Sequence, residues 1–245
     1  MLFNRETEAS NTESMRREFV SHLRSNYSLN TPKSRTGHLF VLEGIDGSGK
    51  TCVCEQLTEI LRSENYDVVR LREPTHESQW GKEIREKSPG GELTPDEELE
   101  LYTKDREWHI TTKIQPALEE GKVVLMDRYF FASGAYQSTV LDLHWREILQ
   151  INREELSAPE PDIVFILDVP AEIGLERATG RSGKANLQFE KLDRLIRVRR
   201  NYLEIAEHDI SNVKLIDSLK PLQQVIYEIH KIIIDFINNS KSEPL

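Results

Sequence analysis

Short apolar segments alternate with longer amphipathic segments along most of the chain. Five apolar runs have the length of buried strands, and they span residues 39–42, 67–71, 123–126, 162–169 and 213–216. Elsewhere apolar residues recur every three or four positions, which predicts helices. These helices span residues 52–63, 79–87, 94–120, 130–138, 144–156, 171–179, 189–207 and 221 onward. Strands that alternate with helices predict a parallel sheet covered on both faces. We therefore expect an α/β protein with three layers, α/β/α, around a five-stranded parallel sheet.

Local signals mark the ends of the long segment 94–120. Thr94 and Pro95, followed by acidic residues, are typical of a helix start, and Gly121 is typical of a helix end. The polar residues 1–36 form an N-terminal extension that ends in a linker at residues 32–37. This extension is either partly ordered or a short helix that docks on the core or on a partner. We expect residues 37–240 to form one domain.

The first apolar run leads directly into a glycine-rich loop. Residues 44–51 read Gly-Ile-Asp-Gly-Ser-Gly-Lys-Thr and match the phosphate-binding loop (P-loop) G-x-x-x-x-G-K-[ST]. Its glycines permit tight turns that present backbone N–H groups to a phosphate. Lys50 is expected to reach the outer phosphates, and the Thr51 hydroxyl to ligate Mg²⁺. The alternative is a glycine-rich turn that binds nothing. The expected nucleoside triphosphate site comprises Gly44, Asp46, Gly47, Ser48, Gly49, Lys50 and Thr51.

The composition narrows the possible classes of function. The chain has 245 residues and a formal net charge of −10, with 42 acidic and 32 basic residues. This balance argues against a nonspecific nucleic-acid binder, and we expect no nucleic-acid partner. No apolar stretch is long enough to span a membrane, so no membrane partner is expected.

The same sequence features suggest a compartment. Cys52 and Cys54 are too close together in a helix to pair, so they are interpreted as small packing residues in a reducing compartment. The N-terminus lacks an apolar secretion signal, and its acidic residues are atypical of an organellar transit peptide. We expect a cytoplasmic protein.

Three further features favour phosphoryl transfer to a small molecule. No Asn-Lys-x-Asp guanine-reading motif occurs, which weighs against a GTPase. Asp127 ends an apolar strand, the position expected of an acid that organises Mg²⁺, although it could instead cap the next helix. Arg72, Arg106 and Arg128 could line one cleft and bind phosphate oxygens there, or each could be a solvated surface charge.

An ordered set of short motifs then points to a family. These motifs are the loop at residues 44–51, Arg72-Glu-Pro, Asp105-Arg106, Asp127-Arg-Tyr and Ala135-Tyr-Gln. Over about residues 38–236 their order and spacing resemble the thymidylate (dTMP) kinases, which are P-loop nucleoside monophosphate kinases. The resemblance implies a P-loop fold and Mg²⁺-dependent transfer of the ATP γ-phosphate to dTMP, for dTTP synthesis. It also implies a homodimer.

The resemblance also implies roles for individual residues. Lys50, Arg128, Asp46 and Arg181 would be catalytic, and Thr51 and Asp127 would hold Mg²⁺. The substrate-binding residues would be Arg72, Glu73, Pro74, Tyr102, Arg106, Arg128, Ser133, Tyr136 and Gln137.

Within that substrate set, each group has its own expected task. Arg72 and Arg128 would hold the acceptor phosphate, and Arg106 would hydrogen-bond the base. Tyr102 stands where the family usually has a stacking phenylalanine, although plain helix packing is the alternative. Tyr136 and Gln137 match a pair that lies against the deoxyribose and base, where a tyrosine ring can exclude a 2′-hydroxyl.

The chain departs from the family pattern at three places. The expected lid, about residues 181–190, lacks the common Arg-Gly-x-x-Asp-Arg-x-Glu sequence. Gly47 stands where some members have an arginine, and Ala132 where the family often has Ser or Thr. The missing positive charge would then come from Arg177, Arg181 or Lys184. Two rival functions stay open: a kinase for another nucleoside monophosphate or a deoxynucleoside, and a nucleotide-binding regulatory protein with a degenerate lid.

Overall fold

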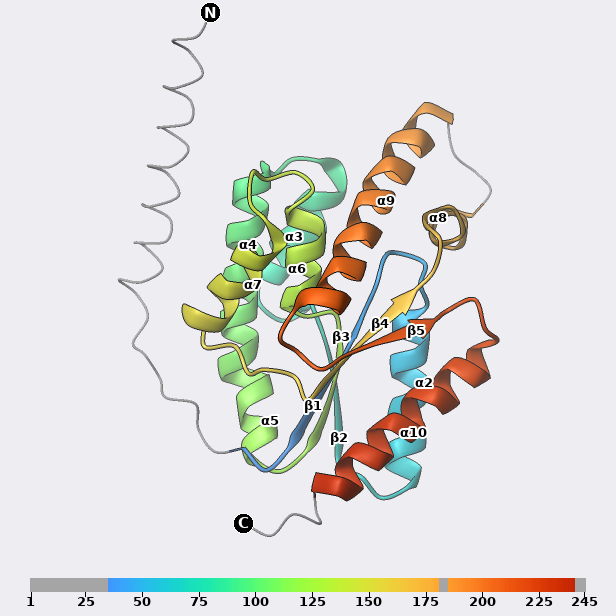
Figure 1. Ribbon diagram of the computed structural model, residues 1–245. Helices are drawn as coiled ribbons and strands as arrows, with labels where there is room; N and C mark the ends of the chain where they lie inside the picture. Colours follow the sequence, from blue (N-terminus) through green and yellow to red (C-terminus); the bar gives the residue numbers. More distant parts are fainter. Residues whose placement is uncertain (1–34, 181–184, 241–245) are drawn as a thin grey trace, which may run out of the picture.

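The computed structural model describes residues 35–180 and 185–240. Its elements surround one parallel sheet (Figure 1). Its strands are β1 (His38–Glu43), β2 (Val68–Arg72), β3 (Val123–Asp127), β4 (Ile163–Asp168) and β5 (Val213–Asp217). Their order across the sheet is β2-β3-β1-β4-β5, and every neighbouring pair is parallel. The predicted five-stranded parallel sheet is therefore confirmed.

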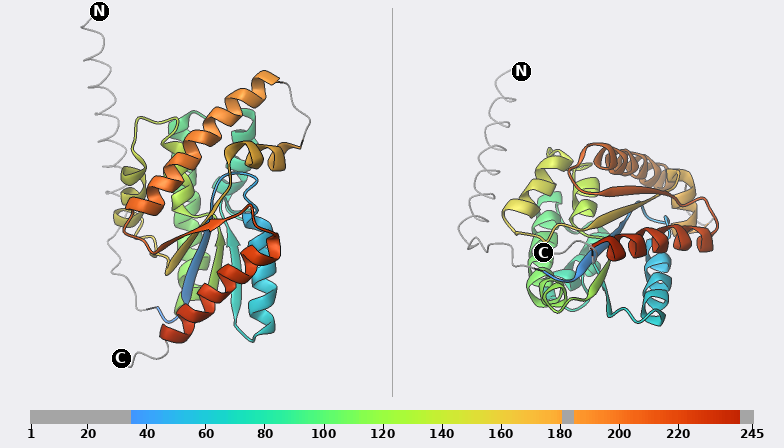
Figure 2. Two further views of the ribbon diagram at one scale, coloured as in Figure 1. Left: turned by 45° about the vertical axis from the view of Figure 1, so that its right-hand side comes forward. Right: turned by 60° about the horizontal axis from the view of Figure 1, so that its bottom comes forward.

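Helices cover both faces of this sheet, as the views in Figures 1 and 2 show. One face carries α2 (Lys50–Ser63) and α10 (Leu222–Ser240). The other face carries α5 (Gln115–Glu119), α6 (Phe130–Gln137), α7 (Trp145–Glu154) and α9 (Ala185–His208). Three helices lie farther out: α3 (Gln79–Lys87) packs on α4 (Pro95–His109), and α8 (Ala171–Thr179) packs on α9. None of the helices in the described ranges is apolar over enough length to cross a membrane.

The central strands are buried on both faces because their alternate side chains enter two separate cores. On β1, Leu39 and Val41 belong to the core beneath α6, α7 and α9. The intervening Phe40 and Leu42 belong to the core beneath α2 and α10. This burial on both faces explains why the sequence of β1 shows a continuous apolar run.

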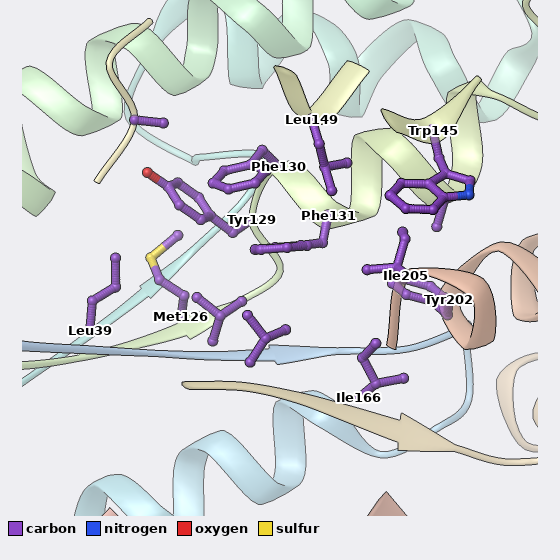
Figure 3. Packing of buried hydrophobic residues seen from close by; sticks show 14 of the residues in the cluster. Leu39, Met126, Tyr129, Phe130, Phe131, Trp145, Leu149, Ile166, Tyr202 and Ile205 are labelled. Atoms are coloured by element: carbon purple, nitrogen blue, oxygen red, sulfur yellow. The ribbon is translucent and has the colours of Figure 1, made fainter. Parts of the chain in front are cut away.

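Aromatic residues anchor the start of α6 to the sheet. Tyr129, Phe130 and Phe131 are fully buried, and their ring centroids lie 4.7 Å and 4.3 Å apart in succession. Trp145 of α7 and Tyr202 of α9 belong to the same cluster (Figure 3). Aromatic rings bury large apolar areas, so this cluster holds α6 in a defined position above the carboxyl ends of the strands.

The predicted helix over residues 94–120 forms, but it is not uniform. A π-helical segment, Ile110–Ile114, separates α4 from α5. Pro116 follows at the start of α5 and cannot donate the i→i−4 hydrogen bond. Within the π-segment, the hydroxyls of Thr111 and Thr112 donate to the carbonyls of Glu107 and Trp108. A π-turn inserts the extra residue that lets the helix continue past the proline.

Two other elements differ from the expected ones. Residues 88–90, expected in a loop, form the short 3-10 helix η1 (Ser88–Gly90). Helix α9 begins at Ala185, four residues before the predicted start. Of the expected lid, residues 181–184 lie outside the described residues, and the remainder belongs to α9.

The strand order places the carboxyl ends of β1, β2 and β3 side by side. Asp127 at the end of β3 is the register partner of Leu42 on β1 and of Arg72 on β2. Residues that follow three different strands therefore meet at one edge of the sheet. In open parallel sheets, ligands bind at this edge.

The packing of α10 leads to a test of stability. Ile229 is fully buried in the core beneath α10, whereas Tyr227 on the same helix is 69% exposed. Ile229→Ala should lower the free energy of unfolding by about 2–5 kcal/mol, because it removes buried methyl groups and leaves a cavity. Tyr227→Ala is the control and should change it by less than about 0.5 kcal/mol. Urea denaturation measures both, and equal effects would contradict this assignment of the inner face.

Candidate active site

Three glycines shape the loop that follows β1. Gly44, Gly47 and Gly49 have φ angles of 136°, 77° and 93°, which residues with a Cβ rarely adopt. Gly49 is also the N-cap of α2, so the helix begins at Lys50, as the P-loop pattern predicts. The first turn of α2 thus points its free N–H groups into the loop, an arrangement suited to binding an anion.

The Lys50 side chain lies inside this loop. Its ammonium donates hydrogen bonds to the carbonyl oxygens of Gly44 and Ile45 at 3.0 Å and 2.8 Å, and to Ser48 Oγ at 3.2 Å. Burial lowers the pKa of Lys50 to about 7, and the nearby Arg128 guanidinium lowers it further, against the opposing effect of Asp46. An anion in the loop would favour the charged form of Lys50.

Thr51 and Asp127 form a pair of oxygen groups beside the loop. The Thr51 hydroxyl donates to Asp127 Oδ2 at 2.6 Å, while Asp127 Oδ1 is buried without a hydrogen-bond partner. The Arg72 Nε atom lies 3.7 Å from Oδ2. A hydroxyl beside a carboxylate with a free oxygen fits Mg²⁺, which prefers a few protein oxygens together with phosphate and water. In the described part of the chain, no group of three or more His, Cys, Asp or Glu residues is placed to hold a metal ion.

A different carboxylate caps the helix that follows Asp127. Glu43 at the end of β1 accepts hydrogen bonds from the backbone N–H groups of Tyr129 and Ala132, at 2.7 Å and 3.2 Å. Its other oxygen accepts from the Tyr202 hydroxyl at 2.8 Å. The alternative interpretation of Asp127 as a helix cap is therefore wrong, because Glu43 occupies that position. Asp127 points instead to Thr51 and Arg72.

Arg128 joins the loop to α6. Its φ of 73° is unusual for a residue with a side chain, and such strained backbone is concentrated at functional sites. The guanidinium contacts the Asp46 carboxylate and donates to the Gly44 carbonyl at 3.3 Å and to the Tyr136 hydroxyl at 3.4 Å. The Tyr136 hydroxyl in turn accepts from the Asp46 N–H at 3.0 Å. Although burial opposes ionisation, Arg128 and Lys50 lower the pKa of Asp46.

These residues border a pocket of about 510 Å³ between the loop, α4, α6 and α9. All the predicted substrate residues line it, from β2 onward: Arg72, Glu73, Pro74, Tyr102, Arg106, Arg128, Ser133, Tyr136 and Gln137. Tyr102 is on α4, and burial raises its pKa to about 12. The Gln137 side chain is 3% exposed, and its amide oxygen has no hydrogen-bond partner. The pocket therefore offers a buried acceptor for a ligand hydrogen bond.

Arg106 is held rigidly in the wall of this pocket. Its guanidinium donates to Glu73 Oε2 at 2.8 Å, to Asn152 Oδ1 at 2.7 Å and to Ser133 Oγ at 3.1 Å. Glu73 also lies 3.2 Å from His109 Nδ1. Glu73 and Ser133 thus orient Arg106, in addition to lining the pocket themselves.

The segment after β2 is fixed by a second buried carboxylate. Asp105 accepts from the Thr75 N–H at 2.8 Å and from the hydroxyls of Thr75 and Ser78, both at 2.5 Å. Ser78 is also the N-cap of α3. Asp105 on α4 therefore holds the turn that carries Glu73 and Pro74.

Arg177 of α8 contacts the segment that follows β5. Its guanidinium donates to the Ser218 carbonyl at 3.1 Å, and the Ser218 hydroxyl donates to the Ser48 carbonyl at 2.5 Å. Arg177 therefore contacts the segment that supports the loop and does not line the large pocket. The other two lid cations, Arg181 and Lys184, lie outside the described residues.

Comparison with known proteins supplies the family. The thymidylate kinase family model matches residues 42–229. A probable thymidylate kinase of Archaeoglobus fulgidus is 44% identical over 204 residues, covering 83% of this chain and 98% of that protein. A thymidylate kinase of Xanthomonas oryzae is 37% identical over 198 residues, covering 81% and 83%. A probable thymidylate kinase of Pyrococcus horikoshii is 39% identical over 197 residues, covering 77% and 92%.

The chain belongs to the thymidylate kinase family. The motifs that carry the resemblance form the loop and supply residues of the pocket lining.

The structure explains why position 47 of this family member has no side chain. A Cβ on Gly47 would lie 2.0 Å from the Gly174 carbonyl oxygen of α8, and the φ of 77° is itself unfavourable for other residues. A Cβ on Gly174 would likewise lie 2.7 Å from the Asp46 carbonyl oxygen. The two glycines let α8 pack directly against the loop. No arginine fits at position 47, so any additional cation must come from another element.

Several residues of this thymidylate kinase family site were missed from the sequence. Glu43 could have been found, because it ends an apolar strand in the same way as Asp127. Asn152 carries no such signal, since it lies in an ordinary amphipathic helix. Lys191 and Arg194 of α9 also line the pocket, but α9 carries several arginines and the sequence does not distinguish the one that faces inward.

The buried Glu43 carboxyl predicts a pH dependence of stability. Burial raises its pKa from 4.5 to about 7, against the opposing effects of Arg128 and the Tyr202 hydrogen bond. Between these values the folded chain binds a proton that the unfolded chain releases, so this residue makes folding less favourable as pH rises through that range. Glu43→Gln should remove this contribution and flatten the profile. Urea denaturation from pH 5 to 8 measures the effect, and profiles with the same slope would contradict the raised pKa.

Proposed function

We propose that this chain transfers the γ-phosphate of ATP to dTMP, giving ADP and dTDP. The observation that supports this proposal is that the triphosphate loop and the large pocket share one wall. Asp46 belongs to the triphosphate loop, and its partner Arg128 lines the pocket of about 510 Å³. Donor and acceptor phosphates bound on the two sides would therefore meet beside one ion pair. Enzymes that position two substrates in this way need no covalent intermediate.

The donor half is proposed to consist of the loop and the Thr51–Asp127 pair. Gly44, Gly47, Ser48 and Gly49 would surround the phosphates with backbone N–H groups, and Lys50 would move from its carbonyl partners to the phosphate oxygens. Thr51 and Asp127 would hold Mg²⁺, which, when bound, neutralises charge on the phosphates. Arg177 is proposed to support the loop through Ser218.

The acceptor half is proposed to bind phosphate at one end and base at the other. Arg72 and Arg128 would bind the phosphate, and the Tyr136 ring would lie against the deoxyribose. Tyr102 would stack on the base, while Gln137 and Arg106 would hydrogen-bond its edge. The unpartnered Gln137 oxygen suits the N3–H donor of thymine.

The family relationship supports two further proposals about the protein in the cell. We propose that it acts in the cytoplasm, where dTMP is phosphorylated for dTTP synthesis, and that it assembles as a homodimer. Light scattering of the purified chain would measure the oligomeric state directly.

The proposed function predicts a definite order of acceptors. A coupled assay of ADP formation should give the highest kcat/KM with dTMP among dTMP, dUMP, UMP, CMP, AMP and thymidine. The ribonucleotides should react less well because the Tyr136 ring is proposed to lie where their 2′-hydroxyl would be, and thymidine because it lacks the phosphate that Arg72 and Arg128 are proposed to bind. Turnover should stop when EDTA removes Mg²⁺. A ribonucleotide that reacts as well as dTMP would exclude the assignment. ATP binding without turnover of any acceptor would favour a regulatory protein.

The base contact predicts a specific effect at Gln137. Gln137→Leu should raise the KM for dTMP about 3- to 10-fold, because it removes one hydrogen-bond acceptor. Thermal stability should not fall, since the Gln137 oxygen has no partner within the protein. The control is Gln150→Leu, which makes the same change on the exposed face of α7. An unchanged KM would place Gln137 outside the base pocket.

Arg106 is less suitable for such a test. It is 1% exposed, and its removal would leave the buried Glu73 carboxylate without its main partner. Breaking a buried ion pair in this way costs about 3–5 kcal/mol of stability. A loss of activity in Arg106→Ala would therefore not distinguish a base contact from a folding defect.

A further inference from the structure

A cation of α9 faces the proposed acceptor pocket. Arg194 lines that pocket, and its guanidinium carbon lies 6.0 Å from the centroid of the Tyr136 ring. The Arg128 guanidinium lies 5.0 Å from the same centroid. The positive charge of Arg194 also contributes to the lowered pKa of Asp46, which lines the same pocket. Two guanidinium groups therefore lie near the ring of one tyrosine in the pocket.

The hydrogen bonding of Arg194 is incomplete. Its Nε atom is buried and has no hydrogen-bond partner, whereas Arg106 uses all three of its nitrogens. Burying a donor of a charged group without a partner costs more than burying one that is bonded. This donor belongs to a side chain that lines the pocket, so Nε is not committed to a protein partner and the guanidinium is free to turn toward an acceptor oxygen of a pocket ligand.

The charge of the pocket identifies the kind of ligand. Among the described residues that line it, five are cationic (Arg72, Arg106, Arg128, Lys191 and Arg194) and three are acidic (Asp46, Glu73 and Glu98). This local excess of positive charge occurs in a chain whose net charge is −10. A phosphate monoester carries nearly two negative charges at pH 7, because its second pKa is about 6. The excess of two positive charges matches such a dianion.

The other pocket arginines are already engaged by carboxylates. Arg106 pairs with Glu73, Arg128 pairs with Asp46, and Arg72 lies 3.7 Å from Asp127. Arg194 makes no ion pair with any side chain that the structure describes. Because no side chain fits at Gly47, the loop cannot supply this charge itself. Among the pocket arginines, Arg194 is thus the one whose charge is most available to a bound phosphate.

We propose that Arg194 is a substrate-binding residue that donates from its guanidinium to a phosphate oxygen of the nucleoside monophosphate. This inference rests on the proposed function and adds a residue of α9 to the acceptor site. Arg194 lines the same pocket as Arg72 of β2 and Arg128 of the segment before α6. Helix α9, which carries Arg194, packs against both α6 and α8.

Binding of dTMP and thymidine to the same variants separates a phosphate contact from a structural role. Arg194→Leu should weaken dTMP binding about 10- to 100-fold in isothermal titration calorimetry, the effect expected for a lost charge-assisted hydrogen bond. Thymidine, which lacks the phosphate, should bind the variant and the wild-type chain equally well. Arg200→Leu is the matched control, because Arg200 is exposed on the same helix. It should leave both affinities unchanged.

A second variant covers the case in which the leucine side chain disturbs folding. Arg194→Lys retains the charge and should recover part of the dTMP affinity, while thymidine binding stays constant. Equal loss of dTMP and thymidine affinity in these variants would assign Arg194 a structural role and overturn the inference. Unchanged dTMP affinity would overturn it as well. Failure of the wild-type chain itself to bind dTMP would instead overturn the proposed function.

Discussion

A buried carboxylate at the end of the first strand connects the parts of the cleft. Glu43 directly precedes the triphosphate loop and accepts two backbone hydrogen bonds at the start of α6. It also accepts a hydrogen bond from the Tyr202 hydroxyl of α9. Its neighbour Gly44 contacts both Lys50 and Arg128. One side chain thus positions the triphosphate loop, α6 and α9 relative to one another. Such a fully bonded buried group favours one arrangement over others.

The remaining charges of the site follow the same principle of local pairing. Arg106 is held by Glu73, Asn152 and Ser133, and Arg128 is held by Asp46 and Tyr136. Buried ion pairs contribute little net stability, because desolvation offsets their attraction. They do orient guanidinium groups before a ligand arrives, which reduces the reorganisation needed for binding and transfer. The site therefore uses its carboxylates mainly to aim its arginines.

Backbone proximity at one point has a chemical consequence. Gly47 and Gly174 bring the loop and α8 so close that neither position accepts a Cβ. This packing excludes an arginine from the loop and assigns the additional positive charge to other elements. Arg177 is used to support the loop through Ser218, whereas Arg194 faces the acceptor pocket from α9.

The sequence by itself determined the layered fold and the residues at strand ends. Continuous apolar runs specify strands buried on both faces, and the spacing of the loop glycines specifies a turn that binds phosphate. These are local properties, so they are visible without knowledge of the fold. The sequence predicts one continuous helix over residues 94–120 and does not predict the π-segment before Pro116.

Only the tertiary structure decided which polar groups meet. Glu43 and Asp127 both end apolar strands, yet one caps α6 and the other faces Thr51, because they leave neighbouring strands in different directions. Asn152 and Arg194 belong to helices whose polar residues look alike in sequence, and the packing of those helices selects the ones that face inward. Contacts between residues more than a hundred positions apart, such as Glu43 with Tyr202, depend on strand order and helix packing. No local pattern encodes them.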